Sequence, residues 1–206
     1  IDTILFLQKM GAQVTVDVDR RIIVDGVSQL HGARHNTITD RIEVASFATA
    51  AVATNGSVRV MGAQQSHMIS FLNNLRKVGG AFDIDDQGIT FFRESDVLRP
   101  IHLETDVHPG FMTDWQQPFV VLLTQADGVS VIHETVYENR FGYTHSLNEM
   151  GADVNLCTSC LGSKSCRFQA HNFEHSCIVR GPSKLEATSI VIPCSRSATR
   201  PSVMSA

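Results

Sequence analysis

The sequence predicts an α/β fold built from repeated units of about 70 residues, in which helices are buried inside and sheets face outward. The first observation is a Leu-x-x-x-Gly pattern that recurs without gaps. Its glycines are Gly11, Gly79 and Gly151, at intervals of 68 and 72 residues. Each copy is expected to close an amphipathic helix, because glycine adopts the left-handed conformation found at helix ends, and a strand follows. Three copies at nearly equal spacing indicate an internal repeat.

A second observation is that an aspartate opens an apolar helical run at matching positions in two units. Asp40 precedes an alanine-rich run over residues 42–54, and Asp114 precedes a second apolar run over residues 115–126. In both places the aspartate is expected to cap the first helical turn. The alanines let neighbouring helices approach closely, so the first run is expected to form a helix buried on most of its faces.

The third observation is the order of the remaining elements, which is the same in both units. After its first helix, each unit is expected to continue with a strand, a second helix and a β-hairpin. The expected elements are strands at 56–60 and 128–132, second helices at 65–78 and 140–150, a hairpin of 81–84 with 89–92, and a preceding strand at 101–104. Two nearly full copies lie between residues 39 and 181. Residues 1–36 hold the end of an earlier copy, and a further copy begins near Lys184.

The composition fits a folded protein and excludes some classes of partner. Hydrophobic residues make up 43% and charged residues 18% of the chain, which is enough apolar material for a core. The net charge is −4 and the basic residues do not cluster, so neither nucleic acid nor an anionic membrane surface is expected as a partner. A few well-placed arginines would still suffice to bind an anionic small molecule. No apolar run approaches the roughly 20 residues that span a bilayer.

The beginning of the sequence and its cysteines bear on where the protein resides. The first residues include no basic segment or cleavage site of a secretion signal, and no initiator methionine. We therefore expect the sequence to begin within a longer protein. The cysteines number five, which is odd, and without an export signal reduced thiols and a cytoplasmic location are expected.

Two motifs carry the strongest functional signal. Residues 108–117 are HPGFMTDWQQ, and residues 134–141 are ETVYENRF. They resemble the UDP-N-acetylglucosamine enolpyruvyl transferases, which carry P-x-F-P-T-D-x-Q followed by E-T-V/I-F/Y-E-N-R-F at the same spacing. Residues 39–43, TDRIE, are similar to the D-R-I-E of that family at the crossing between its two domains. The resemblance covers residues 1–193, with an insertion near residues 157–173.

The resemblance implies a fold and a domain organisation. The family has two domains of similar architecture, each an inside-out α/β barrel of three repeated units. Residues 1–38 are then expected to be the remnant of the first, catalytic-loop domain, and residues 39–206 about two thirds of the second. The sister family that acts on shikimate 3-phosphate shares the fold but lacks this pair of motifs, so it is the weaker enzyme alternative.

The resemblance also implies an activity that needs no cofactor. The enolpyruvyl group of phosphoenolpyruvate would be transferred to the 3-hydroxyl of UDP-N-acetylglucosamine, the first committed step of peptidoglycan precursor synthesis. The sugar hydroxyl must lose a proton, and Asp114 matches the family aspartate that contacts this hydroxyl and is proposed as the base. From the residues alone, Asp114 could equally be only a helix cap.

By the same resemblance, Asp114 is expected to bind the substrates together with four further residues: Thr113, Val136, Arg140 and Arg196. Arginine forks suit the carboxylate and phosphate groups of these polyanions. From the residues alone, Val136 is an ordinary strand-end residue and Arg140 could instead pair with Glu138. Around Arg196 the local match fails, because residues 193–196 are PCSR where the family has T-D-L-R or P-D-L-R.

Several parts of the family's active site are absent from this sequence. The proton-donating cysteine or aspartate, the Lys-Asn clamp for phosphoenolpyruvate and the main uridine-binding segment all belong to the first domain. The missing first-domain segment is thus an expected partner, and the 206-residue chain alone is expected to be inactive. The tail from residue 194 onward is polar and is expected to pack poorly.

A cluster of cysteines and histidines is the main rival signal. It consists of Cys157, Cys160, Cys166, His171, His175 and Cys177. Such ligands could build a tetrahedral zinc site, but a second CxxC is missing and the spacing fits no standard zinc finger. The expectation is therefore an elaborated hairpin with free thiols and no metal. The alternative is a metal-binding or regulatory module that uses the transferase scaffold without catalysis.

Overall fold

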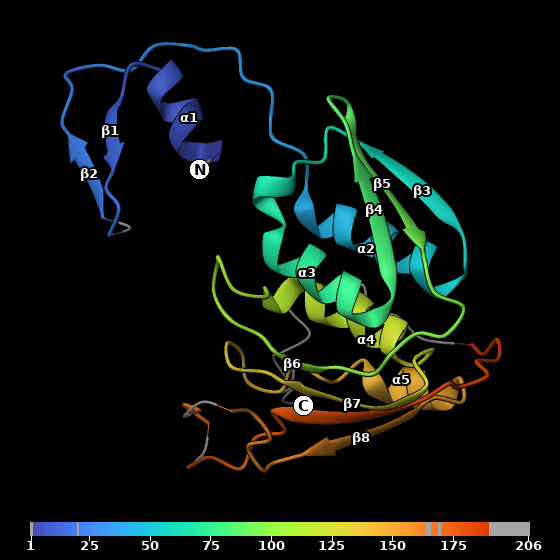
Figure 1. Cartoon of the computed structure of the whole chain (residues 1–206). Coiled ribbons are helices and arrows are strands. Elements are labelled where there is room, and N and C mark those ends of the chain that lie inside the picture. The colour runs from blue at the N-terminus through green and yellow to red at the C-terminus, as the bar shows by residue number, and fades with distance from the viewer. Residues whose placement is uncertain (1, 20, 164–165, 169, 190–206) are drawn as a thin grey trace, which may run out of the picture.

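The computed structural model describes residues 2–19, 21–163, 166–168 and 170–189. From residue 39 onward, two copies of one unit follow each other (Figure 1). The first contains α2 (Arg41–Ala53), β3 (Ser57–Met61), the 3₁₀ turn η1 (Gln65–His67), α3 (Ile69–Val78), β4 (Gly80–Ile84) and β5 (Gly88–Arg93). The second contains β6 (His102–Glu104), the 3₁₀ turn η2 (Thr113–Trp115), α4 (Gln116–Leu123), β7 (Gly128–His133), α5 (Thr144–Glu149), β8 (Asp153–Cys157) and β9 (Ser176–Gly181).

The two sheets have the same strand order, which confirms the internal repeat. In the first unit the order is β3-β5-β4, and in the second β7-β9-β8, with all of these neighbours antiparallel. Strand β6 is added to the second sheet and pairs in parallel with β7. The expected strands and the first hairpin are therefore confirmed, with residues 85–87 connecting the two strands of the hairpin.

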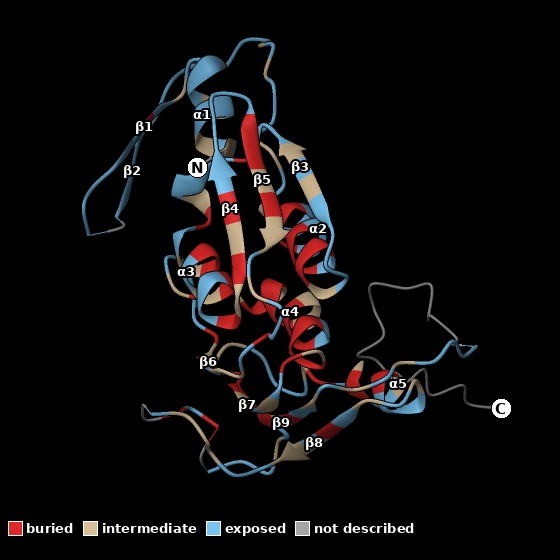
Figure 2. Ribbon diagram, turned by 45° about the vertical axis from the view of Figure 1, so that its right-hand side comes forward, coloured by how far each residue is buried: buried red, intermediate tan, exposed pale blue. Residues whose placement is uncertain are grey.

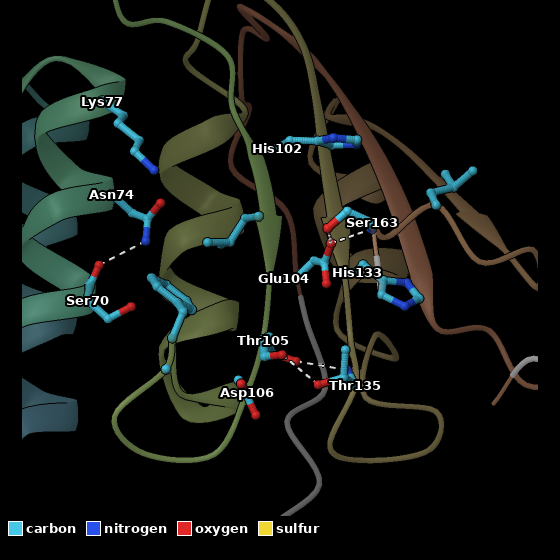
Figure 3. A pocket seen from close by; sticks show the side chains of 14 residues that line it. Ser70, Asn74, Lys77, His102, Glu104, Thr105, Asp106, His133, Thr135 and Ser163 are labelled. Carbon is cyan, nitrogen blue, oxygen red and sulfur yellow. Dashed lines mark hydrogen bonds between the residues drawn. The ribbon is translucent and has the colours of Figure 1, made fainter. Parts of the chain in front are cut away.

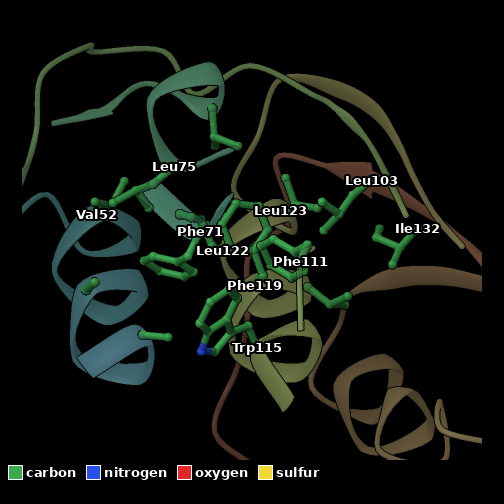
Figure 4. Packing of buried hydrophobic residues seen from close by; sticks show 14 of the residues in the cluster. Val52, Phe71, Leu75, Leu103, Phe111, Trp115, Phe119, Leu122, Leu123 and Ile132 are labelled. Atoms are coloured by element: carbon green, nitrogen blue, oxygen red, sulfur yellow. The ribbon is translucent and has the colours of Figure 1, made fainter. Parts of the chain in front are cut away.

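The helices form a layer between the two sheets. Helix α2 packs against α4 and against β3 and β5, while α4 also contacts β9. The buried residues concentrate in these helices and on the sheet faces turned toward them (Figure 2). Four aromatic rings, with centroids 5.2–6.3 Å apart, fill the centre: Phe71, Phe111, Trp115 and Phe119 (Figure 4). The predicted arrangement of helices inside and sheets outside is confirmed.

The repeated glycines end their helices as the sequence predicts. Gly11, Gly79 and Gly151 have φ angles of 94°, 111° and 98°, in the left-handed region that a side chain rarely adopts. Gly79 is followed at once by β4, and the other two by β1 and β8 after one residue. The same backbone solution thus connects helix to strand in each copy.

Three expectations about the helices need correction. Asp40 does cap α2, where its carboxylate accepts from the backbone N–H of Ile42 at 2.8 Å, but Asp114 caps no helix. It lies inside η2, before the start of α4, and its side chain pairs with Arg140. The second helix of the second unit begins at Thr144 and not at residue 140, because residues 138–143 form turns. Helix α2 is buried on one face only, since Phe47 on the other face is 55% exposed.

The first residues differ from the rest in how little they bury. They form α1 (Asp2–Lys9) and the hairpin of β1 (Gln13–Val16) with β2 (Ile22–Asp25), as expected. Within these elements only Val14 is buried, and many apolar side chains are exposed, among them Phe6, Val16, Ile22 and Val24. In Figure 1 this segment stands apart from the two units. Among the described residues, no helix is long and apolar enough to cross a membrane.

Candidate active site

The buried carboxylate of Glu134 organises the region of the two motifs. Glu134 follows β7 and is fully buried. Its Oε2 accepts from the Thr113 hydroxyl at 2.8 Å and from the Gln116 amide at 2.9 Å. Its Oε1 accepts from the backbone N–H groups of Val136 and Tyr137 at 2.8 and 3.1 Å. Four donors thus surround a charge that would otherwise be costly to bury, and they connect the first motif to the second.

Beside this network, Asp114 and Arg140 face each other. Arg140 Nη2 donates to Asp114 Oδ1 at 2.5 Å, and the two side chains are 31% and 39% exposed for Arg140 and Asp114 respectively. The Gln117 amide, oriented with its oxygen toward Arg140, accepts from Arg140 Nε at 2.8 Å. The guanidinium also lies 5.2 Å from the centre of the Tyr137 ring. The pair is therefore held in place and is still reachable from solvent.

The local backbone explains why Arg140 points toward Asp114. Asn139, just before it, has φ of 50°, in the left-handed region that asparagine tolerates better than most residues. The chain consequently turns sharply between β7 and α5. Arg140 pairs with Asp114, and Glu138 pairs instead with Arg167 at 3.1 Å, so the alternative pairing of Arg140 with Glu138 is wrong.

Neighbouring elements hold the 3₁₀ turn that contains Asp114. The Trp115 indole donates to the carbonyl of Arg41 at 3.1 Å, which ties the turn to the start of α2. The Tyr143 hydroxyl donates to Gln116 Oε1 at 3.0 Å. Burial raises the pKa of Tyr143 well above its ordinary value, so this hydroxyl stays neutral and serves as a fixed donor.

The structure brings together four of the five residues expected at the site. Thr113, Asp114, Val136 and Arg140 meet around Glu134, while Arg196 lies outside the described residues. The Thr113 hydroxyl and the Val136 N–H are both directed to Glu134. Glu134 is the residue whose role the sequence did not reveal. Its only signal was its place at the head of the second motif.

A cavity of about 520 Å³ lies elsewhere, between α3 and the strands β6 and β7 (Figure 3). Its lining includes Asn74 and Lys77 from α3, and His102, Glu104 and His133 from the sheet. Neither Asp114 nor Arg140 borders it. We place the candidate site at the Asp114–Arg140 pair, because among the described residues a carboxylate, an arginine fork and both motifs converge there.

The buried Cys177 is not poised to react. Cys177 belongs to the hydrophobic core, and burial raises its pKa to about 12, so it remains a thiol. The four described cysteines, Cys157, Cys160, Cys166 and Cys177, form no disulfide.

Comparison with known proteins agrees with the fold and the motifs. Residues 1–176 match the family described as EPSP synthase (3-phosphoshikimate 1-carboxyvinyltransferase). UDP-N-acetylglucosamine 1-carboxyvinyltransferase of Protochlamydia amoebophila is 56% identical over 193 residues, which are 94% of this chain and 42% of that protein. The protein of the same name from Chlamydia muridarum is 51% identical over 193 residues, which are 94% of this chain and 44% of that protein. The chain thus spans less than half the length of these curated relatives.

Solved structures show the same architecture. The enolpyruvyl transferase NikO from Streptomyces tendae aligns with a TM-score of 0.74 at 21% identity, over 90% of this chain and 41% of that one. EPSP synthase from Acinetobacter baumannii aligns with a TM-score of 0.58 at 16% identity, over 88% of this chain and 40% of that one. The fold and the two motifs define an inside-out α/β protein of the enolpyruvyl transferase type. The chain belongs to the EPSP synthase family.

Proposed function

We propose that the full-length protein transfers the enolpyruvyl group of phosphoenolpyruvate to the 3-hydroxyl of UDP-N-acetylglucosamine. The observation that carries this proposal is the exposed Asp114–Arg140 pair, fixed by the network around Glu134. A carboxylate next to an arginine fork can take a proton from a hydroxyl and bind an anion at the same place. The names of the relatives that are 50–56% identical support the choice of acceptor.

The proposed reaction has two steps. Asp114 takes the proton of the sugar hydroxyl as its oxygen bonds to C2 of phosphoenolpyruvate, while C3 gains a proton from a group outside this chain. Phosphate then leaves from C2 as C3 loses a proton, which restores the double bond. Asp114 suits the first proton transfer, because its carboxylate is partly exposed and is oriented by Arg140.

The other site residues have distinct proposed roles. Arg140 would bind the phosphoenolpyruvate carboxylate with donors now shared with Asp114 and Gln117. Val136 would contact the nucleotide sugar through its backbone carbonyl, because its N–H is already directed to Glu134. Thr113 would orient the turn through its bond to Glu134. Arg196 would add a second anion-binding arginine.

We further propose that residues 1–38 belong to the first domain and residues 39–206 to an incomplete second domain. The apolar residues exposed on α1, β1 and β2 support this, since such a surface is normally covered. Phe47 on the free face of α2 supports a third unit packed against the other two. The partner of this chain would then be the first-domain segment that supplies the proton donor and the uridine site, and domain closure would exclude water.

The test is phosphate release by the full-length protein with phosphoenolpyruvate and one of two acceptors. Release that depends on UDP-N-acetylglucosamine is expected. Release only with shikimate 3-phosphate would assign the sister reaction, and no release with either acceptor would overturn the transferase proposal. The 206-residue chain by itself is expected to release none, and turnover by it would refute the domain assignment.

A further inference from the structure

The hairpin of the second unit contains a long loop that the first unit lacks. In the first unit, residues 85–87 connect β4 to β5, whereas residues 158–175 separate β8 from β9. The part of this loop that the structure describes lies over the end of β7, where Gly162 faces His133. There Cys160 Sγ, Cys166 Sγ and a ring nitrogen of His133 all lie within 4.8 Å of one another. His175 Nε2 lies 3.1 Å from Cys160 Sγ, so a second imidazole lies beside this group, although it is not one of the three residues whose atoms all lie within 4.8 Å of one another.

The hydrogen bonds of His133 fix which of its nitrogens carries the hydrogen. The Ser176 hydroxyl donates its only hydrogen to the carbonyl of Ser159 at 2.8 Å. It must therefore accept from His133 Nδ1, which lies 2.9 Å away. His133 Nε2 is then an unprotonated lone-pair nitrogen. It is buried and has no hydrogen-bond partner, which is unusual for a polar atom in a residue only 1% exposed.

The second imidazole is oriented in the same way. His175 Nδ1 lies 2.7 Å from the carbonyl oxygen of Phe173, and a carbonyl can only accept, so Nδ1 carries the hydrogen. Its Nε2 lone pair is directed at Cys160, and the residue is fully buried. Nδ1–H bonded to an oxygen, with the Nε2 lone pair unprotonated, is the arrangement that orients histidine ligands of metals.

The surroundings of the sulfurs fit the same picture. The backbone N–H of Phe168 donates to Cys166 Sγ at 3.3 Å, a contact that also stabilises a thiolate. The Phe168 ring lies 5.7 Å from that of His175 and shields it. Gly162 lets the loop close over His133, because a Cβ at this position would lie 2.3 Å from the imidazole.

Against the sequence-based expectation of free thiols and no metal, we propose that His133, Cys160 and Cys166 bind one Zn²⁺ ion that fixes this loop to the sheet. His175, which already contacts Cys160, would move toward the ion and supply the fourth ligand. Two imidazole nitrogens and two thiolates are the Cys₂His₂ donor set of structural zinc, and the two thiolate charges neutralise the ion. Both thiol protons are released when the ion binds. The remaining members of the sequence cluster lie apart. Cys177 is in the core, and the His171 ring packs 5.6 Å from that of Phe173.

Zinc binding would also fix one wall of the neighbouring cavity. Leu161 and Ser163, which follow the ligand Cys160 by one and three residues, line that cavity. The Ser163 hydroxyl donates to Glu104 on β6 at 2.7 Å. Figure 3 shows Ser163, Glu104 and His133 at this wall. Zinc at the four ligands would hold this wall in its present position. Zinc binding at these residues would be independent of the transferase activity.

The test is metal binding by the full-length protein, stripped with a chelator under reducing conditions and titrated with Co²⁺. One Co²⁺ per chain is expected, with tetrahedral ligand-field bands and a thiolate-to-cobalt charge-transfer band, both lost when Zn²⁺ displaces it. Cys160→Ser and Cys166→Ser should lose the charge-transfer intensity of one thiolate each. Ser176→Ala should weaken zinc binding about 10- to 100-fold, the usual effect of removing an outer hydrogen bond.

Cys157→Ser is the matched control, because Cys157 lies three residues before Cys160 but ends β8 outside the group. It should bind cobalt and zinc as the unmodified protein does. A folded, reduced, unmodified protein that binds neither ion overturns the proposal, and this outcome does not depend on any variant. Full binding by both serine variants at positions 160 and 166 would also overturn it.

Discussion

The two units of this chain share a topology but differ in the roles of the residues at matching positions. Asp40 caps α2, whereas its counterpart Asp114 lies within the 3₁₀ turn η2 and pairs with Arg140. The first hairpin turns at Asp85, whose carboxylate accepts from two backbone N–H groups, whereas the second opens into the cysteine–histidine loop. The first copy shows what the fold requires. The chemistry of the second copy lies where it departs from that pattern.

The largest effect should come from Asp114→Asn in the full-length protein. If Asp114 accepts the hydroxyl proton, kcat should fall by about 10²–10⁴, the usual contribution of general acid–base catalysis. Stability should change by less than about 1 kcal/mol, because the lost ion pair is partly exposed. Steady-state phosphate release and urea unfolding measure the two quantities.

Asp153→Asn provides the matched control for this experiment. Asp153 also forms an ion pair, with Arg180 at 3.3 Å, and its side chain is 53% exposed on the outer sheet. The substitution removes a similar charge pair away from the motifs, so kcat should not change. Equal kinetic losses in the two variants would show that Asp114 acts through charge or stability and not through the reacting hydroxyl.

A smaller effect, on stability, is expected for Glu134→Gln. The amide keeps the size of the carboxylate but replaces one acceptor oxygen with a donor, so it cannot satisfy the four donors that now surround Glu134. Each buried donor left without an acceptor costs about 1–3 kcal/mol. The free energy of unfolding from urea titration should therefore fall by at least about 2 kcal/mol.

Glu138→Gln makes the same chemical change four residues away. Glu138 pairs with Arg167 near the surface, where an ion pair contributes less than about 1 kcal/mol. If both glutamine variants lose the same stability, the network around Glu134 does not hold the two motifs together.

The sequence could predict those parts of the fold that depend on local chemistry. Gly11, Gly79 and Gly151 mark helix ends because the left-handed backbone conformation that ends a helix depends on the residue at that position and not on distant contacts. β-Branched residues after turn glycines likewise placed the strands, and the resemblance assigned Asp114 and Arg140 to one site without predicting that they pair. These signals act over a few residues, or were supplied by the resemblance.

What the sequence could not predict depends on contacts between distant elements. The position of Asp114 in a 3₁₀ turn follows from long-range bonds, such as that of Trp115 to Arg41, which no local pattern contains. Glu134 and His133 are adjacent, yet one organises the motifs and the other faces the cysteine loop. His133 also lies 27 residues before Cys160, so spacing within the cysteine cluster did not reveal it.

The smallest effect is expected in the first unit, where Asp40 has only a capping role. Asp40→Ala removes the acceptor for the Ile42 N–H and should lower the free energy of unfolding by about 1 kcal/mol. Asp40→Asn keeps an acceptor oxygen, and asparagine caps helices about as well as aspartate, so its loss should be clearly smaller. Neither variant should change kcat, and urea unfolding with an unchanged slope would measure the difference.

If the Asp40→Asn variant loses as much stability as Asp40→Ala, the negative charge at the start of α2 would be the stabilising feature, through its interaction with the helix dipole. In that case the two aspartates would differ less than their hydrogen bonds suggest, because each would act through its charge.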